Sequence, residues 1–161
     1  MKKILLFALI FVILIGGIFI YIKATPPLAT RTVFNSEDNK TVVVALGNRG
    51  FGELKVTGVK VNNNADPNVA KMQVSNALEG FKGTIDEKSE ARENIEFKHI
   101  QDVSIPKGTV PENVLQKQGE RKATVDDTIY GLTVNHHEEI HNIHIKYRYF
   151  GILFNETIIL D

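Results

Sequence analysis

The histidines form the one cluster of potentially reactive side chains in this sequence. Four of them fall within nine residues, beside Glu138: His136, His137, His141 and His144. On a helix, the last three would share one face at spacings of four and three, which suits a transition metal. In a strand, His141 and His144 would point to opposite faces, and a loop could still bring His136 to His137 or His141. The sequence therefore leaves two interpretations open, a metal site formed by these histidines or an exposed polar turn.

The other reactive side chains do not form a catalytic pattern. None of the four serines stands in a Gly-x-Ser-x-Gly turn. The acid pairs 126–127 and 138–139 are adjacent, so in an extended chain their carboxylates diverge. The glycines of 47–52 lie between two predicted strands, whereas a phosphate-binding loop leads into a helix. We therefore predict no enzymatic activity and no cofactor.

Composition removes several other classes of function. The chain has 161 residues and no cysteine, which excludes disulfides, Cys-ligated zinc and a lipid-modified cysteine. Three of its 19 basic residues lie in the first 23 positions, whereas all 19 acidic residues lie beyond them. The remainder is therefore mildly acidic, and we expect no nucleic-acid partner, because such binding requires phosphates to be neutralised.

Residues 4–22 predict a helix that spans a membrane. They carry no charge, and 15 of the 19 are Ile, Leu, Phe or Val. At about 1.5 Å per residue they reach roughly 28 Å, close to a hydrocarbon core of about 30 Å. Lys2 and Lys3 favour a cytoplasmic N-terminus, which puts the rest of the chain outside the cell. The side chains expected to contact lipid are Ile4, Phe7, Phe11, Leu14, Phe19 and Tyr21.

A cleaved signal peptide is the competing interpretation of this segment. Its apolar stretch is usually about 7–15 residues long and ends in small residues. Here the run is longer, and only Ala24 offers a plausible cut. Both interpretations send the rest of the chain to the same place, and we favour a retained anchor in the cell membrane.

Beyond the anchor, apolar residues recur at every second position, which is the period of a strand rather than that of a helix. We expect an anchor over 1–23, a linker over 24–40 in which Pro26-Pro27 prevent the helix from continuing, and a β domain over 41–161. Within that domain, 86–94 and 112–127 are polar and are predicted to be exposed. The expected strands cover 41–46, 54–61 with an irregularity at Gly58, 71–76, 95–105, 129–134, 143–149 and 152–160.

The last part of the chain has the clearest pattern. Ile143, Ile145, Tyr147 and Tyr149 alternate with polar residues, so one face of this strand should lie in the core. We also expect Phe150 in the core. Seven or eight short strands with turn signals between them, and no long amphipathic helix after residue 23, indicate an all-β sandwich.

Two stretches carry a resemblance to a known class of domain. VVVALGNRGFGELKVTGVKV (42–61) resembles the second and third strands of immunoglobulin-like bacterial domains, and FKHIQDVSIPKG (97–108) is similar to the strand before a Pro-x-Gly turn in such sandwiches. The chain as a whole resembles small signal-anchored surface proteins of Gram-positive, Bacillus-like bacteria that have no assigned activity. The resemblance implies an immunoglobulin-like sandwich and a surface location, and no function.

The function expected from the sequence is that of a membrane-anchored, non-enzymatic binding module outside the cytoplasm. Its partners would be the lipid bilayer, through residues 4–22, and an unknown protein or cell-wall polymer. The alternative is a surface metal-binding domain that uses the histidine-rich loop 136–144.

Overall fold

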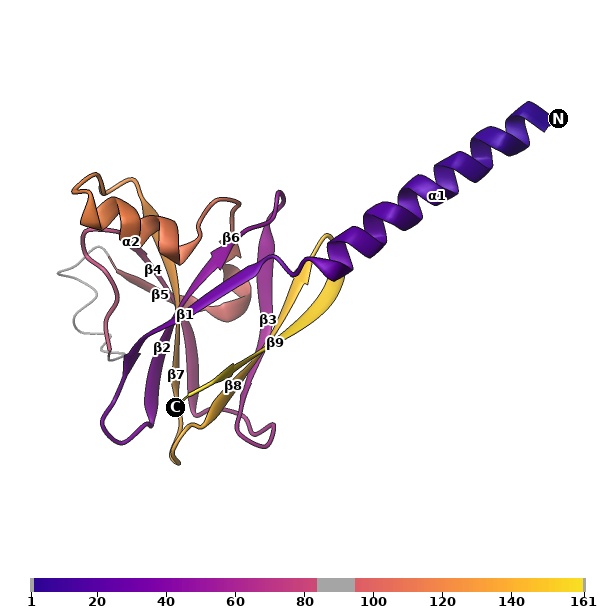
Figure 1. Cartoon of the computed structure of the whole chain (residues 1–161). Coiled ribbons are helices and arrows are strands. Elements are labelled where there is room, and N and C mark those ends of the chain that lie inside the picture. The colour runs from indigo at the N-terminus through magenta and orange to yellow at the C-terminus, as the bar shows by residue number, and fades with distance from the viewer. Residues whose placement is uncertain (1, 84–94, 161) are drawn as a thin grey trace.

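In the described part of the chain, nine strands form two antiparallel sheets that enclose one apolar core (Figure 1). The structure is a computed structural model that describes residues 2–83 and 95–160. One sheet has the strand order β1-β2-β7-β4-β5, and the other has the order β6-β3-β8-β9. The strands are β1 Leu28–Asn35, β2 Thr41–Asn48, β3 Leu54–Val61, β4 Val69–Asn76, β5 Glu96–His99, β6 Ser104–Ile105, β7 Thr128–Asn135, β8 Asn142–Tyr149 and β9 Ile152–Ile159.

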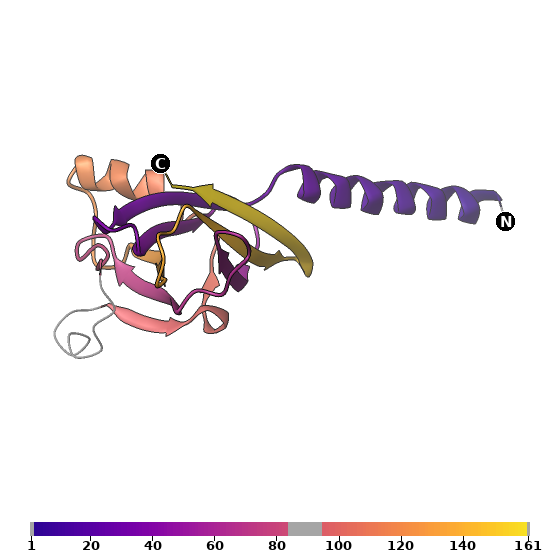
Figure 2. The same cartoon turned by 90° about the horizontal axis from the view of Figure 1, so that it is seen from below.

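Among the residues that the structure describes, three helices accompany the sheets. They are α1 Lys2–Ala24, the short 3-10 helix η2 Ile100–Asp102, and α2 Pro111–Gly119. In two views at right angles, α1 points away from the sheets (Figure 1, Figure 2). Within residues 2–83 and 95–160, no helix combines the length and the apolar character needed to cross a membrane.

Strand β8 places its apolar residues as the alternation predicts. Ile143, Ile145, Tyr147 and Tyr149 are all buried in the core, and the residues between them are exposed or half-buried. Buried residues of β2 and β7 in the other sheet, among them Val44 and Leu132, belong to the same core. The alternation predicts this face correctly because only one side of β8 is covered.

Strand β2 is buried on both faces, which explains its unbroken apolar run. Every residue from Val42 to Asn48 is buried. The second layer over the outer face of this sheet includes α2, beside β1 and β2, and the segment 80–83. In that segment the Phe81 ring lies over Gly131, and the Gln73 side chain accepts from Lys82 N at 3.0 Å and donates to Lys82 O at 2.8 Å. A strand covered on both sides cannot show alternation.

Most predicted strands are confirmed, including 71–76 within β4 and 129–134 within β7. The irregularity expected at Gly58 is confirmed as well, because the register between β3 and β8 shifts between Val56 and Gly58. The predicted two-sheet, mostly β architecture is therefore correct. The described residues form nine strands rather than the expected seven or eight, because β1 was not predicted and η2 divides the strand expected over 95–105 into β5 and β6.

Two expectations were wrong. The linker predicted over 24–40 contains β1, which pairs with β2 along its length, so only Thr25–Pro27 separate α1 from the sheet. The stretch 112–127 is largely exposed, as predicted, and it contributes α2, which begins with Pro111 at its first turn, where a missing N–H has no cost. Phe150 was placed in the core but is 54% exposed. The predicted polar loop 86–94 lies outside the described residues.

Candidate functional site

The loop between β7 and β8 brings three potential metal ligands together. They are His136, His137 and Glu138, whose ligand atoms all lie within 4.8 Å of one another. The centroids of the two imidazole rings are 4.1 Å apart, and His137 Nε2 lies 3.7 Å from Glu138 Oε1. Their ligand atoms lie close together because β7 ends at Asn135. The chain turns there, so the side chains that follow do not alternate between two opposite faces as they would in a strand.

The two histidines have different surroundings. His136 is buried, and its Nδ1 has no hydrogen-bond partner among the residues that the structure describes. A buried polar atom without a partner costs on the order of 1–3 kcal/mol, so this ring would gain from a ligand. His137 is exposed, and its Nδ1 lies 3.1 Å from Asn68 Oδ1. Such a contact orients the ring and leaves Nε2 available to a metal.

The other two predicted ligands lie outside this group of three. His144, on β8, has both ring nitrogens engaged, with Nδ1 3.0 Å from Thr157 Oγ1 and Nε2 2.9 Å from the carbonyl oxygen of Asn62. Its hydrogen bonds tie β8 to β9 and to the end of β3. His141 is exposed, and its backbone N–H donates to Asn62 Oδ1 at 2.8 Å.

Neighbouring loops hold the β7–β8 loop in place. Buried Ile140 donates its N–H to the carbonyl oxygen of Asn39 at 2.8 Å, and the Asn62 amide donates to the carbonyl oxygen of Glu139 at 2.8 Å. The Asn39 amide also donates to Glu139 Oε1 at 2.6 Å. Loops 36–40, 62–68 and 136–141 therefore form one end of the sandwich, which we call the distal end (Figure 1).

The donor set of His136, His137 and Glu138 fits zinc. Two imidazoles and a carboxylate are common Zn²⁺ ligands, at about 2.0–2.2 Å, and such a set leaves a fourth position for water. In a tetrahedron of that size, ligand atoms are about 3.3 Å apart. The present spacing of up to 4.8 Å would have to contract, which exposed His137 and Glu138 can do by changing rotamer.

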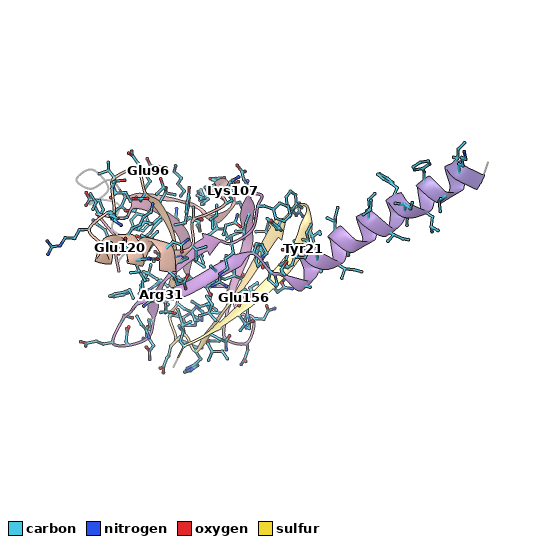
Figure 3. All side chains as sticks on the ribbon, turned by 45° about the horizontal axis from the view of Figure 1, so that its top comes forward. Tyr21, Arg31, Glu96, Lys107, Glu120 and Glu156 are labelled. Carbon is cyan, nitrogen blue, oxygen red and sulfur yellow. The ribbon has the colours of Figure 1, made fainter. Side chains whose placement is uncertain are left out.

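A second functional feature is the exposure of α1. The six side chains predicted to contact lipid are all between 52% and 74% exposed: Ile4, Phe7, Phe11, Leu14, Phe19 and Tyr21. The opposite side of the helix is exposed as well, at Leu6, Leu9 and Val12, so the exposed apolar side chains of α1 surround it rather than follow one stripe (Figure 3). A helix that packed on the domain would instead hide one face.

Only the last turn of α1 contacts the sandwich. Ile22 is 7% exposed and belongs to the core cluster. Lys23 Nζ donates to the carbonyl oxygen of Leu153 at 3.1 Å and lies 4.9 Å from the centre of the Phe154 ring. Phe154 in turn stacks on Tyr147, and burial raises the pKa of Tyr147 to about 12. The helix is therefore fixed to the domain at one point and free along the rest of its described length.

Searches against family models, curated proteins and solved structures found no match for this chain.

Proposed function

We propose that the chain is a membrane-held, extracytoplasmic β-sandwich that acts as a non-enzymatic binding module. The observation that carries this proposal is α1, in which fourteen large apolar side chains are between 45% and 74% exposed. Exposed apolar surface of this extent marks an interaction site, and lipid is the partner that covers all faces of one helix at once. Lys23 and Tyr21, at its end, are residue types that favour the membrane–water boundary.

The proposal gives the distal end a role. With α1 in a bilayer, the loops around Asn62 and His137 face away from the lipid. Loops at one end of a sandwich are common recognition surfaces because the sheets hold them in place. The distal loops are polar, and they are joined by the hydrogen bonds of Asn39 and Asn62. We infer that a protein or a cell-wall polymer binds there.

We further infer that the domain is immunoglobulin-like and that the chain belongs with the small surface proteins of Gram-positive bacteria that its sequence resembles. The order of the strands supports the first inference. The series β1-β2-β7-β4 corresponds in chain order to strands A-B-E-D of such domains, and β3-β8-β9 corresponds to C-F-G. Strands β5 and β6 would then be additions at the sheet ends.

Membrane fractionation of cells that produce the full chain tests the anchor. We expect the protein in the membrane pellet after alkaline carbonate washing, and a Phe11→Lys/Leu14→Lys variant in the supernatant, because two charges oppose insertion. The matched control places the same charges at exposed sites of the domain, Asn63→Lys and Ile159→Lys. Release of the unaltered protein would contradict the anchor, and loss of residues 1–24 by mass would establish cleavage instead.

Crosslinking in intact cells tests the binding module. A photoreactive side chain at Asn63 should give a specific adduct, whereas the same probe at Leu115, on α2, should not. If no adduct forms at the distal end under mild conditions, the binding role is refuted.

A second candidate function is metal binding at His136, His137 and Glu138. The observation that favours it is the buried, unpartnered Nδ1 of His136 beside two further ligands. Calorimetric titration of the full chain in detergent with Zn²⁺ should show one site, and zinc at 100 times the Kd should stabilise the fold by about 2.7 kcal/mol. His137→Ala should abolish both effects, whereas His99→Ala, on β5, should change neither. No heat and no shift in Tm with the unaltered chain would exclude the site.

A further inference from the structure

Two exposed aromatic rings form a patch at the end of the sandwich opposite to the distal end. Phe51, in the β2–β3 loop, is 59% exposed, and Phe150, in the β8–β9 turn, is 54% exposed. Their ring centroids are 5.1 Å apart, and both rings pack on buried Tyr149, at 6.0 and 4.6 Å. We call Phe51 and Phe150 the aromatic patch.

The fold holds the β2–β3 loop rigidly under this patch. The Tyr149 hydroxyl accepts hydrogen bonds from the backbone N–H groups of Phe51, at 2.9 Å, and Gly52, at 3.3 Å. A Cβ on Gly50 would lie 2.4 Å from that hydroxyl, and one on Gly52 would lie 2.5 Å from the Phe150 ring. Only glycine allows so close an approach, so the loop is shaped to keep the two rings in position.

Phe150 has an unfavourable backbone conformation. The β8–β9 turn has two residues, Phe150 with φ of 48° and Gly151 with φ of 76°, as in a type I′ turn. The first position of that turn favours Asn, Asp or Gly, and the left-handed region costs other residues roughly 1–2 kcal/mol. An exposed Phe here therefore lowers stability and also exposes apolar surface. A partner for the ring would offset both costs.

The patch lies beside the end of α1. Phe51 lines one surface pocket together with Tyr21 and Ile22, and Lys23 reaches the carbonyl oxygen of Leu153, which lies in β9 shortly after Phe150. Figure 3 places Tyr21 where α1 meets the β8–β9 hairpin. Any bilayer that holds α1 up to Tyr21 therefore also reaches Phe51.

We propose that the aromatic patch inserts into the interfacial layer of the bilayer that holds α1. This proposal rests on the proposed membrane anchor. Aromatic side chains favour that layer, and Tyr21 and Lys23 mark its level on the helix. With α1 and the patch both in lipid, the domain contacts the bilayer at two neighbouring places. The second contact restricts the tilt of the domain about the end of α1 and keeps the distal end away from the membrane.

Single tryptophans test this in the full chain, reconstituted in phosphatidylcholine vesicles, because the sequence contains no Trp. The variants are Phe51→Trp, Phe150→Trp, Phe11→Trp within α1, and Ile159→Trp, which is 75% exposed and paired with Asn142 near the distal end. Each is measured for its emission maximum and for quenching by lipids that carry a quencher at a known depth.

We expect blue-shifted emission and quenching by shallow quenchers for Phe51→Trp and Phe150→Trp, quenching by deep quenchers for Phe11→Trp, and neither change for Ile159→Trp. If Phe11→Trp is quenched while the two patch variants behave like Ile159→Trp, the patch proposal is overturned and the anchor stands. If Phe11→Trp is not quenched, the anchor fails and the patch proposal fails with it. Blue-shifted patch emission without lipid quenching would place the patch against protein, such as a second copy of the chain, which also overturns the proposal.

Discussion

Replacing Asn48 by Ala should destabilise the domain strongly, because this side chain joins three segments of the chain. Asn48 is buried at the end of β2. Its amide donates to the carbonyl oxygens of Gly52, at 2.7 Å, and Ile105, at 2.9 Å, and its Oδ1 accepts from the N–H of Gly50 at 2.8 Å. Alanine removes all three hydrogen bonds and leaves their partners unsatisfied.

At about 1 kcal/mol for each hydrogen bond, the expected loss is about 3 kcal/mol. Urea unfolding of the full chain in detergent, followed by circular dichroism of the β domain, measures this loss. With a slope of about 1–3 kcal/mol per M, the midpoint should fall by roughly 1–3 M at unchanged slope. Asn48→Asp should destabilise at least as much, since a carboxylate would face two carbonyl oxygens. Exposed Asn63→Ala is the control and should stay within about 0.5 kcal/mol. An Asn48→Ala variant as stable as that control would show that these three hydrogen bonds do not stabilise the domain.

Three further predictions use the same unfolding assay or a titration. Gly131→Ala would place a Cβ 2.7 Å from the Phe81 ring and should cost about 1–3 kcal/mol; an unchanged midpoint would show that Phe81 does not cover β7. Gly119→Ala, at the end of α2 with nothing within 4 Å, should instead stabilise by about 0.5–1 kcal/mol, and a loss of stability would contradict the helix. Burial raises the pKa of Tyr147 to about 12, so its contribution to stability is complete below the ordinary tyrosine pKa of about 10 and is lost between pH 10 and 12. Ultraviolet absorbance should show a late tyrosinate phase that Tyr147→Phe removes, and an unchanged titration would exclude the burial.

Strands with one covered face could be predicted from their alternation, and β2, which is covered on both faces, from its run of β-branched apolar residues. In β8, burial alternates residue by residue from Ile143 to Tyr149, so hydropathy alone reveals it. The irregularity at Gly58 could be predicted for the same reason. The alternation of apolar and polar residues in β3 changes phase there, where its register with β8 shifts. The local sequence reveals which face of such a strand is buried, because successive side chains point alternately into the core and into solvent.

The elements that were missed have little apolar periodicity. In β1, only Leu28 and Ala29 are buried, and the rest of this edge strand is largely exposed, so its pairing with β2 leaves no pattern in the sequence. Helix α2 has nine residues, too few for an isolated helix to be stable in water, and it forms where it can dock on the sheet. Phe150 was assigned to the core because its side chain is apolar, but it lies in the turn with Gly151 and is exposed.

The candidate site was predictable only in part. The sequence placed four histidines near one another but could not say which of them meet. That depends on where β7 ends, which groups His136 with His137, and on Asn62, which engages His144 from another loop. Asn68, the partner of the His137 ring, lies 69 positions earlier in the chain, and no local pattern identifies it.

We propose that α1 holds the sandwich outside a membrane, and the absence of cysteine allows this orientation to be measured directly. In intact cells, Asn63→Cys at the distal end should react with a membrane-impermeant maleimide. Lys3→Cys, at the start of α1, should react only after the cells are permeabilised. Protection of Asn63→Cys in intact cells, or equal labelling of both variants before permeabilisation, would contradict the proposed orientation.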